Sequence, residues 1–503
     1  MTFTRTEDSP FKNTSVLAED FIPDKVLGRQ KELEQIEEVF QQIVDVEEPV
    51  NAFIYGISGT GKTVSIKFKQ RELENSLQAY DDVNATFIYQ NCESLNSSYQ
   101  AAIAIANSFL NDPEYEFLHE RLDISRRVLP SSGLPKERVY RILFTIFDSL
   151  TYRNTEYRAR INSALDQAED ISSSVSARVL LDNPDTLGTQ ESDRILSKLE
   201  EEYDIRSPDD VTDYVTVILD EVDRIGTRDE LLYEIPRSRM NNRVENIRPS
   251  VIGISNDIGY KESIQSKTDS SLRLKEITFK KYDVAQLTKI LEQRAEKAFN
   301  DGAYEQIVDL AAAYARKEGG DARYGIDLLY KAGMKAKKQG DSVVREQHVR
   351  EAHEEHERDR VYEVTADLGD HEKLVLAGVM YHDLKGETPV ARAELYPTYQ
   401  RFSHAVLNDK NGSRRVADYL KRMSQLGLLH RKDVHEGPGE SGFVYTLEKV
   451  DYDMIMHVLR DSTPVGQSAD PDDLVPEELV TAFNELATED HEESQTTVGN
   501  WDS

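Results

Sequence analysis

The sequence predicts an α/β core built on a parallel sheet, followed by an α-helical region and a C-terminal winged-helix domain. Three observations predict this order. A glycine-rich loop lies between an apolar strand and a helix at residues 51–70. A second apolar strand, Val215–Leu219, ends in two acidic residues. A basic amphipathic helix and two strands around a glycine- and proline-containing tip occupy residues 413–447.

Length and composition favour several domains in a reducing compartment. The chain has 503 residues, which at roughly 150 residues per domain corresponds to about three domains. The single cysteine, Cys92, excludes a disulfide framework. No apolar run approaches the ~20 residues of a membrane span, and the N-terminus has no signal-peptide core. We therefore expect a soluble cytoplasmic protein with no membrane partner.

The formal net charge of -32 is unusual. Acidic chains usually repel DNA, because neutralisation of phosphates drives most of that affinity. One interpretation is an acidic protein with no nucleic-acid role. The other is adaptation to molar salt, where the screening length falls to about 3 Å and surface carboxylates keep a protein in solution. The acids are spread along the whole chain, which favours the halophilic interpretation and makes local charge clusters more informative than the total.

The glycine-rich loop has the pattern of a phosphate-binding loop. Residues 56–63 read GISGTGKT and fit G-x-x-x-x-G-K-[ST] at every fixed position. A strand before the loop and a helix after it argue against a chance match. The glycines let backbone N–H groups surround phosphate oxygens, Lys62 would reach the β- and γ-phosphates, and the Thr63 hydroxyl would hold Mg²⁺. The predicted nucleotide-binding residues here are Gly56, Ile57, Ser58, Gly59, Thr60, Gly61, Lys62, Thr63 and Val64.

Two further strands end in polar side chains suited to nucleotide hydrolysis. Val215–Leu219 is followed by Asp220, which would bind Mg²⁺ through water, and by Glu221, which would orient and polarise the attacking water. Val251–Ser255 is followed by Asn256, which would position water against the γ-phosphate. The alternatives are solvated acids at a strand end and an ordinary turn asparagine.

Helices follow the predicted sheet. Tyr282–Asn300 and Tyr304–Lys317 have helical periodicity, and a Gly-Gly-Asp sequence then ends the pattern. Asp321 can cap a new helix whose first turn contains Arg323. From the residues alone, Arg323 is equally well read as a phosphate ligand or as a solvated side chain.

The C-terminal part contains a local reversal of charge. Between Arg401 and Lys432 there are eight lysines and arginines against two acids. The capped helix Ser413–Gln425 has one apolar and one basic face, and the strands Leu428–Asp433 and Gly442–Leu447 follow it. This predicts a winged helix-turn-helix whose basic helix enters the major groove of DNA, with a solvated basic face as the alternative. The predicted DNA-binding residues are Arg414, Arg415, Lys421, Arg422 and Arg431.

Changes of composition and pattern mark the expected segment boundaries. We expect both ends to be largely disordered, because the last 43 residues hold twelve acids and no lysine or arginine, with one short helix at Pro476–Ala487. The predicted segments are a disordered lead-in at 1–16, a nucleotide-binding core at 17–280 with an insertion near 152–208, a helical lid at 281–360, a winged-helix domain at 361–460 and an acidic tail at 461–503.

Together these motifs resemble the archaeal origin-recognition and cell-division-control type of replication initiator, an AAA+ ATPase with a winged-helix domain. FIPDKVLGRQKELEQI is similar to the opening box of that family, with Arg29 near the adenine. GISGTGKT and VILDEVD resemble its Walker A and B motifs, VIGISND its sensor 1 with Asn256, and GGDARYGIDLLYKAG its sensor 2 with Arg323. RDRVYEV leads into its winged helix.

The resemblance implies a slow ATPase that acts as a switch, with ATP or ADP and Mg²⁺ as cofactors. It also implies binding to double-stranded origin DNA in the nucleoid, self-association on that DNA, and loading of the replicative helicase. Glu221, Asn256 and Arg323 would be the catalytic residues, and Arg323 would also contact the nucleotide. Alternatives are an ATP-gated transcription regulator and a remodelling ATPase whose winged helix binds protein.

Two departures from the family pattern point to a divergent haloarchaeal paralogue. The family usually carries a D-P-R-V segment after sensor 1, and Lys267 falls roughly where its arginine finger would be. Lysine lacks the planar fork of arginine, which puts hydrolysis between subunits in question. The insertion near 152–208 has no counterpart in the family pattern. The origin served would be chromosomal or extrachromosomal.

Overall fold

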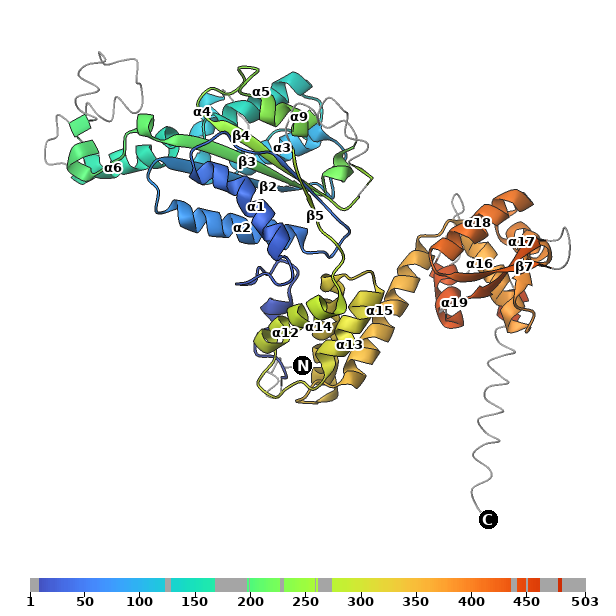
Figure 1. Ribbon diagram of the computed structural model, residues 1–503. Coiled ribbons are helices and arrows are strands. Elements are labelled where there is room, and N and C mark those ends of the chain that lie inside the picture. The colour runs from blue at the N-terminus through green and yellow to red at the C-terminus, as the bar shows by residue number, and fades with distance from the viewer. Residues whose placement is uncertain are drawn as a thin grey trace, which may run out of the picture. The chain divides into compact units, whose positions relative to one another are not determined.

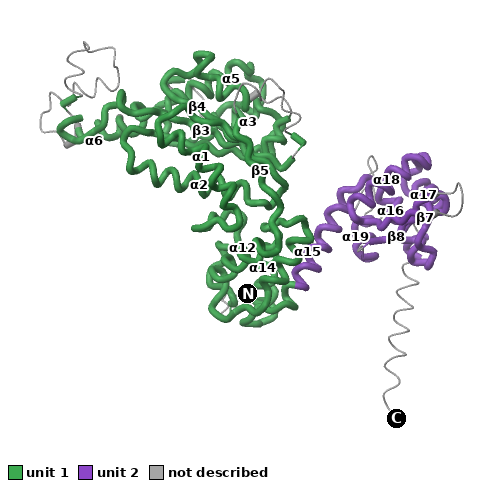
Figure 2. Tube along the Cα trace, viewed as in Figure 1, with its two compact units in different colours: residues 1–349 green, residues 350–503 purple. Residues whose placement is uncertain are grey.

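A computed structural model describes residues 9–122, 128–167, 197–198, 200–226, 230–257, 259–260, 274–435, 441–448, 451–461 and 478–481. The chain forms two compact units, residues 1–349 and 350–503 (Figure 2). The division falls inside a long helix, α15 (Glu346–Ala366). Among the described residues, no helix is both long enough and apolar enough to cross a bilayer.

Unit 1 is organised around a five-stranded sheet in which every paired strand is parallel. The strand order is β2-β3-β4-β1-β5, so β4 lies between β3 and β1, the strand that precedes the glycine loop. The strands are β1 (Ala52–Tyr55), β2 (Val83–Asn91), β3 (Thr212–Asp220), β4 (Arg248–Ser255) and β5 (Lys275–Thr278). Because all strands run the same way, their polar C-terminal residues meet at one edge.

Helices lie on both faces of the sheet (Figure 1), and alternating side chains of the strands are buried on each face. In β3, Val215, Val217 and Leu219 pack on one face, and Tyr214 and Ile218 on the other. The first face is covered by α3 (Ser98–Leu110), α5 (Lys136–Phe147) and α9 (Glu230–Arg237), and the second by α1 (Gln30–Val44) and α2 (Lys62–Leu77). Shorter elements are α4 (Phe117–Arg121) and α6 (Arg158–Gln167).

The helical lid follows β5 and confirms the helices predicted there. It comprises α12 (Val284–Ala298), α13 (Ile307–Lys317) and α14 (Ala322–Gln339). As predicted, Asp321 caps α14, and its side chain accepts hydrogen bonds from the backbone N–H groups of Arg323 and Tyr324. The cap fixes where α14 begins, and therefore which residues face the glycine loop.

The N-terminal segment corrects one expectation. Residues 9–16 are ordered against the lid, whereas we expected residues 1–16 to be disordered; residues 1–8 lie outside the described part. The backbone of Phe11 forms a β-bridge with Phe299, and the two rings stack with centroids 5.1 Å apart. A Cβ atom on Gly333 of α14 would overlap the Phe11 ring, so the glycine makes room for this contact. Packing against the lid therefore orders residues 9–16, although their composition is largely polar.

The insertion near 152–208 is described only at its two ends. Tyr152, Tyr157, Ile161, Ala164 and Ile205 form a small apolar cluster of their own. The middle of the insertion, residues 168–196 and residue 199, lies outside the described part, as does Lys267. The described ends therefore show where the insertion leaves and rejoins the core.

Unit 2 confirms the predicted winged helix. Its elements after α15 are α16 (Asp370–Leu384), β6 (Val390–Ala391), α17 (Arg392–Leu407), α18 (Ser413–Gln425), β7 (Leu429–His435), β8 (Ser441–Leu447) and α19 (Tyr452–Asp461). The strands form an antiparallel sheet in the order β6-β8-β7. The apolar residues of α18, Val416, Leu420 and Met423, are buried in the core of this unit, which leaves its basic face outside.

Part of the acidic tail also packs onto unit 2. Residues 478–481 are helical, within the helix predicted at 476–487, and the other residues from 462 to 503 lie outside the described part. Leu479 is fully buried in the core cluster, and Glu478 pairs with Arg401 at 3.2 Å. These four residues are helical, as expected for the short helix within the tail.

We predict that Leu479→Ala destabilises unit 2 by about 2–5 kcal/mol, because it removes buried side-chain volume. The matched control is Leu426→Ala in the same unit, since Leu426 is 41% exposed and its truncation should change stability by about 0.5 kcal/mol or less. Hydrogen exchange of the β7 and β8 amides in the full-length protein measures both changes. Equal effects of the two substitutions would contradict the packing of Leu479.

Candidate nucleotide-binding and nucleic-acid-binding sites

The glycine loop runs from β1 into α2 and has little space around its backbone. Gly59 and Gly61 adopt left-handed conformations, with φ of 71° and 82°. A Cβ atom on Gly59 would overlap the carboxylate of Asp321 from the lid, and one on Gly61 would press against the Tyr282 hydroxyl. The loop therefore requires glycine both for its backbone conformation and for the close approach of lid residues.

Lys62 lies in the loop with its ammonium group turned inward. It is 5% exposed, and Nζ donates to the carbonyl oxygens of Gly56 at 2.7 Å and Ile57 at 2.9 Å and to Oδ1 of Asn256 at 2.7 Å. Burial lowers the pKa of Lys62 to about 8, partly opposed by the negative charge of Asp220. All three hydrogen-bond acceptors are neutral, so a phosphate would supply a direct anionic partner that favours the charged ammonium.

The carboxylate of Asp220, at the end of β3, faces the first turn of α2. Its Oδ2 accepts hydrogen bonds from the hydroxyls of Thr63 at 2.6 Å and Tyr89 at 2.7 Å, and its Oδ1 accepts one from the Glu221 N–H at 3.0 Å. A hydroxyl and a carboxylate are oxygen ligands of the kind that Mg²⁺ prefers, usually with phosphates and waters. Thr63 and Asp220 therefore fit a magnesium ion that a nucleotide helps to hold.

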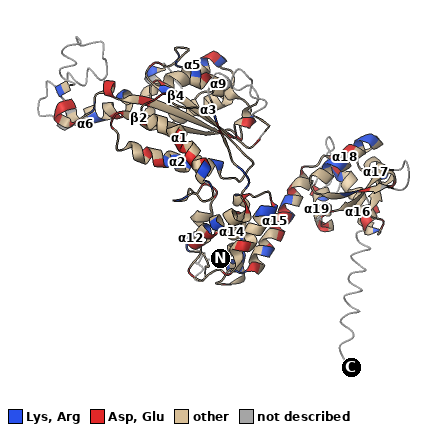
Figure 3. Cartoon of the chain, in the orientation of Figure 1, with Lys and Arg blue, Asp and Glu red and all other residues tan. Residues whose placement is uncertain are grey.

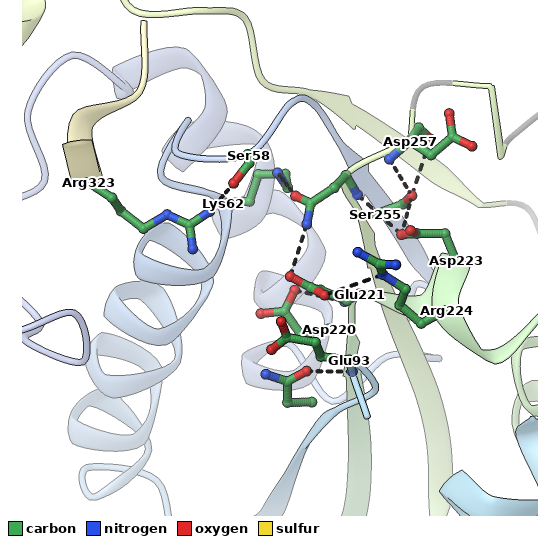
Figure 4. Close-up of polar contacts among 12 residues, drawn as sticks. Ser58, Lys62, Glu93, Asp220, Glu221, Asp223, Arg224, Ser255, Asp257 and Arg323 are labelled. Atoms are coloured by element: carbon green, nitrogen blue, oxygen red, sulfur yellow. Dashed lines mark hydrogen bonds and ion pairs between the residues drawn. The ribbon is translucent and has the colours of Figure 1, made fainter. Parts of the chain in front are cut away.

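Asn256 connects the lysine with the candidate general base. Its Nδ2 donates to Oε1 of Glu221 at 3.0 Å while its Oδ1 accepts from Lys62 (Figure 4). The other carboxylate oxygen, Oε2 of Glu221, is buried and has no hydrogen-bond partner among the described residues. Burial raises the pKa of Glu221, and the charges of Glu93 and Asp220 raise it further. Oε2 thus makes no hydrogen bond to the described residues, although Arg224 Nε lies 3.9 Å away as an ion-pair partner, and it can accept a hydrogen bond from a water molecule.

Asp223 holds the end of β4 in place. Its Oδ1 accepts hydrogen bonds from the Ser255 hydroxyl at 2.7 Å and from the Asn256 N–H at 3.2 Å. Asp223 follows Glu221 by two residues in the sequence VILDEVD, which is the signal that would have identified it. Sequence reasoning missed its role.

Arg323 reaches the glycine loop from the lid. Its guanidinium donates to the Ser58 hydroxyl and pairs with Glu19 at 3.0 Å, and the Ala322 N–H donates to the Gly59 carbonyl at 3.1 Å. The structure thus places Arg323 next to the predicted phosphate site. The partner Glu19 carries no sequence motif, and sequence reasoning did not find it.

Arg29 lies under the loop. It is 2% exposed, its Nε donates to the Thr60 carbonyl at 2.9 Å, and its Nη2 donates to the Lys280 carbonyl at 2.6 Å. The guanidinium also lies 3.7 Å from the centroid of the Tyr282 ring. These contacts join the loop to the start of the lid. The predicted proximity of Arg29 to adenine stays a prediction, as does contact of Val64, in the first turn of α2, with nucleotide.

The predicted DNA-binding residues of unit 2 differ in the contacts that their side chains make. Arg414, Arg415 and Lys421 are exposed on α18, whose basic positions are blue in Figure 3. Arg422 instead donates to both carboxylate oxygens of the buried Glu372, at 2.9 and 3.1 Å. Arg431, on β7, lies over the ring of the exposed Phe443 at 4.1 Å. Arg422 therefore fixes α18 to α16, while the others present charge.

The turn before α18 is fixed by tyrosine hydroxyls. The Asn411 N–H donates to the Tyr399 hydroxyl at 3.0 Å, and the Tyr396 hydroxyl donates to the Asn411 carbonyl at 3.2 Å. The Asn411 amide also donates to the Tyr419 hydroxyl at 3.1 Å. These bonds set the angle between α17 and α18 and so the direction of the basic face. No sequence motif marked these tyrosines.

Comparisons with known proteins match the lid and the winged-helix domain. Residues 288–354 match the model of the Cdc6 AAA+ ATPase-type lid domain, and residues 363–458 match that of the CDC6 C-terminal winged helix domain. The chain is similar to ORC1-type DNA replication protein 11 of Haloarcula marismortui, with 31% identity over 90% of this chain and 91% of the relative. It is similar to the ORC1-type DNA replication protein of Thermococcus kodakarensis, with 30% identity over 85% of each chain.

Solved structures agree with the fold. The Aeropyrum pernix ORC1 protein in complex with DNA is similar over 91% of this chain and 98% of that chain, with a TM-score of 0.60 and 27% identity. The Aeropyrum pernix ORC2 protein, described as ADPNP-ADP complexes, has a TM-score of 0.51 and 20% identity over 89% of this chain and 97% of that chain. The second likeness shows the fold alone.

We predict that Arg414→Ala weakens binding of duplex DNA by about 1–3 kcal/mol if the side chain reaches bases, and by less if it contacts phosphate alone. In the second case the slope of log affinity against log salt falls by about 1. Arg422→Ala, whose wild-type side chain is engaged by Glu372, is the matched control and should change the slope less. A salt titration of DNA binding checks both variants, and a larger slope change for Arg422→Ala would contradict this assignment.

Proposed function

The chain belongs to the family of ORC1-type DNA replication proteins, and on this premise we propose that it is an ATP-dependent initiator that binds double-stranded origin DNA and supports loading of the replicative helicase. The observation that carries the proposal is the hydrogen-bonded set Lys62–Asn256–Glu221 beside Thr63–Asp220. It brings the residues required to bind and cleave a nucleoside triphosphate to one edge of the sheet. The same chain carries a winged helix with an exposed basic helix.

In the nucleotide site, the N–H groups at the start of α2 and the Lys62 ammonium would bind the phosphates of ATP. Thr63 and Asp220 would hold Mg²⁺, which when bound neutralises charge on the phosphates. Glu221 would accept a hydrogen bond from the attacking water, and Asn256 would orient that water. Arg323 would contact phosphate from the lid, so hydrolysis would change the lid contacts. We infer slow turnover that serves as a switch.

In unit 2, α18 would enter the major groove through Arg414, Arg415 and Lys421, and Arg431 in the wing would contact the DNA backbone. Because the family includes a structure of an ORC1 protein with DNA, origin DNA is the partner we propose for this surface. Self-association on DNA and contact with the replicative helicase belong to the same proposal. The protein would act at the nucleoid in the cytoplasm.

A second function is favoured by Lys267. A lysine where the family usually has an arginine finger weakens the case for hydrolysis between subunits. An ATP-gated transcription regulator would use the same winged helix without assembling a helicase loader. The third function we considered, a remodelling ATPase whose winged helix binds protein, has no structural observation in its favour.

We predict sharp binding sites at replication origins. Genome-wide crosslinking of the tagged protein in its native host, followed by immunoprecipitation and sequencing, should give one or a few peaks beside replication start sites. The peaks should disappear in an Arg414→Ala, Arg415→Ala double variant, because the basic face of α18 is lost, and persist in Arg460→Ala, which removes an exposed arginine of α19 in the same unit. Peaks scattered over promoters would favour the regulator, and absence of peaks would mean that the winged helix binds protein.

A further inference from the structure

The side chain of Tyr89 connects three elements of the nucleotide site. Tyr89 lies near the C-terminal end of β2, where it pairs in register with Ile218 of β3. Its ring packs on the sheet face that α1 and α2 cover, with the Lys67 ammonium of α2 at 4.1 Å from the ring centroid. Its hydroxyl reaches across the end of the neighbouring strand to Oδ2 of Asp220 at 2.7 Å. Tyr89 is thus half-buried between β2, β3 and α2.

We propose that Tyr89 is a positioning residue for the magnesium site, because its hydroxyl fixes the orientation of the Asp220 carboxylate. The inference rests on the proposed ATP-binding function and adds a residue to it. Two hydroxyls, from Thr63 and Tyr89, donate to the same carboxylate oxygen, and the Glu221 N–H donates to the other. Three donors from three elements hold this carboxylate, which is itself 5% exposed.

The contribution of Tyr89 differs from that of Thr63. The Thr63 hydroxyl is a predicted ligand of the cation, so part of its hydrogen-bonding capacity would turn toward the metal. The Tyr89 hydroxyl donates to Asp220 from β2 and is not a predicted ligand of the cation, so its hydrogen bond would be kept when the cation binds. Partners that orient a metal-binding carboxylate typically change metal affinity 10- to 100-fold when they are removed. Loss of the Tyr89 hydroxyl should therefore weaken binding of the cation more than binding of the nucleotide.

If Tyr89 served only packing, Tyr89→Phe would leave the affinity for Mg²⁺ unchanged. Phenylalanine at position 89 keeps the ring, and hence the packing on the face covered by α1 and α2 and the contact with Lys67.

A matched control lies at the other end of the sheet. Tyr214, at the start of β3, donates its hydroxyl to the Glu47 carbonyl at 2.8 Å and accepts from Arg248 at 3.1 Å. Tyr214→Phe removes a buried tyrosine hydroxyl without touching the nucleotide site.

The experiment measures binding of a fluorescent ADP analogue to the full-length protein against free Mg²⁺ concentration, and separately in EDTA. For Tyr89→Phe we expect the Mg²⁺ concentration at half-saturation to rise 10- to 100-fold, with affinity in EDTA unchanged. Mn²⁺ binding in the presence of ADP, followed by electron paramagnetic resonance, should weaken by the same factor. Tyr214→Phe should match the wild type in all three measurements.

Asp220→Asn provides the second test, because Tyr89 acts through that carboxylate. Adding Tyr89→Phe to Asp220→Asn should cause no further loss of Mg²⁺ dependence. An unchanged Mg²⁺ half-saturation in Tyr89→Phe, or an equal loss of affinity in EDTA, would overturn the inference while leaving the proposed function intact. A wild-type protein that binds no nucleotide at any Mg²⁺ concentration would overturn the proposed function and this inference with it.

Discussion

The amide of Asn256 is the contact on which the nucleotide site depends. One oxygen and one nitrogen of a single side chain bind Lys62 and Glu221, so the phosphate-binding lysine and the candidate base share one neutral partner. A buried ammonium and a buried carboxylate are costly to desolvate, and hydrogen bonds to neutral groups compensate only part of that cost. Phosphate would compete for the ammonium, which would change the hydrogen bonding of Asn256 and hence of Glu221. In the proposed function, this exchange would let Glu221 respond to bound nucleotide.

The same loop is attached to the lid from two sides. Arg29 joins the Thr60 carbonyl to Lys280 beneath the loop, and the start of α14 contacts Gly59 and Ser58 above it. A change in the loop therefore has two direct routes into α14. The ordered N-terminal segment extends this coupling, because Phe11 packs on the lid and Glu19 pairs with Arg323. In the proposed function, these few contacts would link nucleotide state to the lid.

The sequence predicted the parts of the site that are local. The strand, glycine loop and helix around Lys62 are contiguous, and so are the strand and acids at Asp220, so pattern alone located them. The pairing of Tyr89 with Asp220 joins residues 131 positions apart and depends on which strands are neighbours. The packing of Leu479 and Phe11 likewise depends on tertiary contacts, which overrode polar local composition. Arg414 and Arg422 are both exposed on α18, and only the structure shows that Glu372 engages Arg422.

The central claim is that Glu221 activates water at a site that binds ATP without needing that carboxylate. Single-turnover cleavage of radiolabelled ATP by Glu221→Gln tests it most directly. Glutamine keeps the size of the side chain and still has an oxygen to accept from Asn256, so the variant should bind ATP and leave it uncleaved. Cleavage at the wild-type rate would contradict the account, because the group that polarises water would then lie elsewhere.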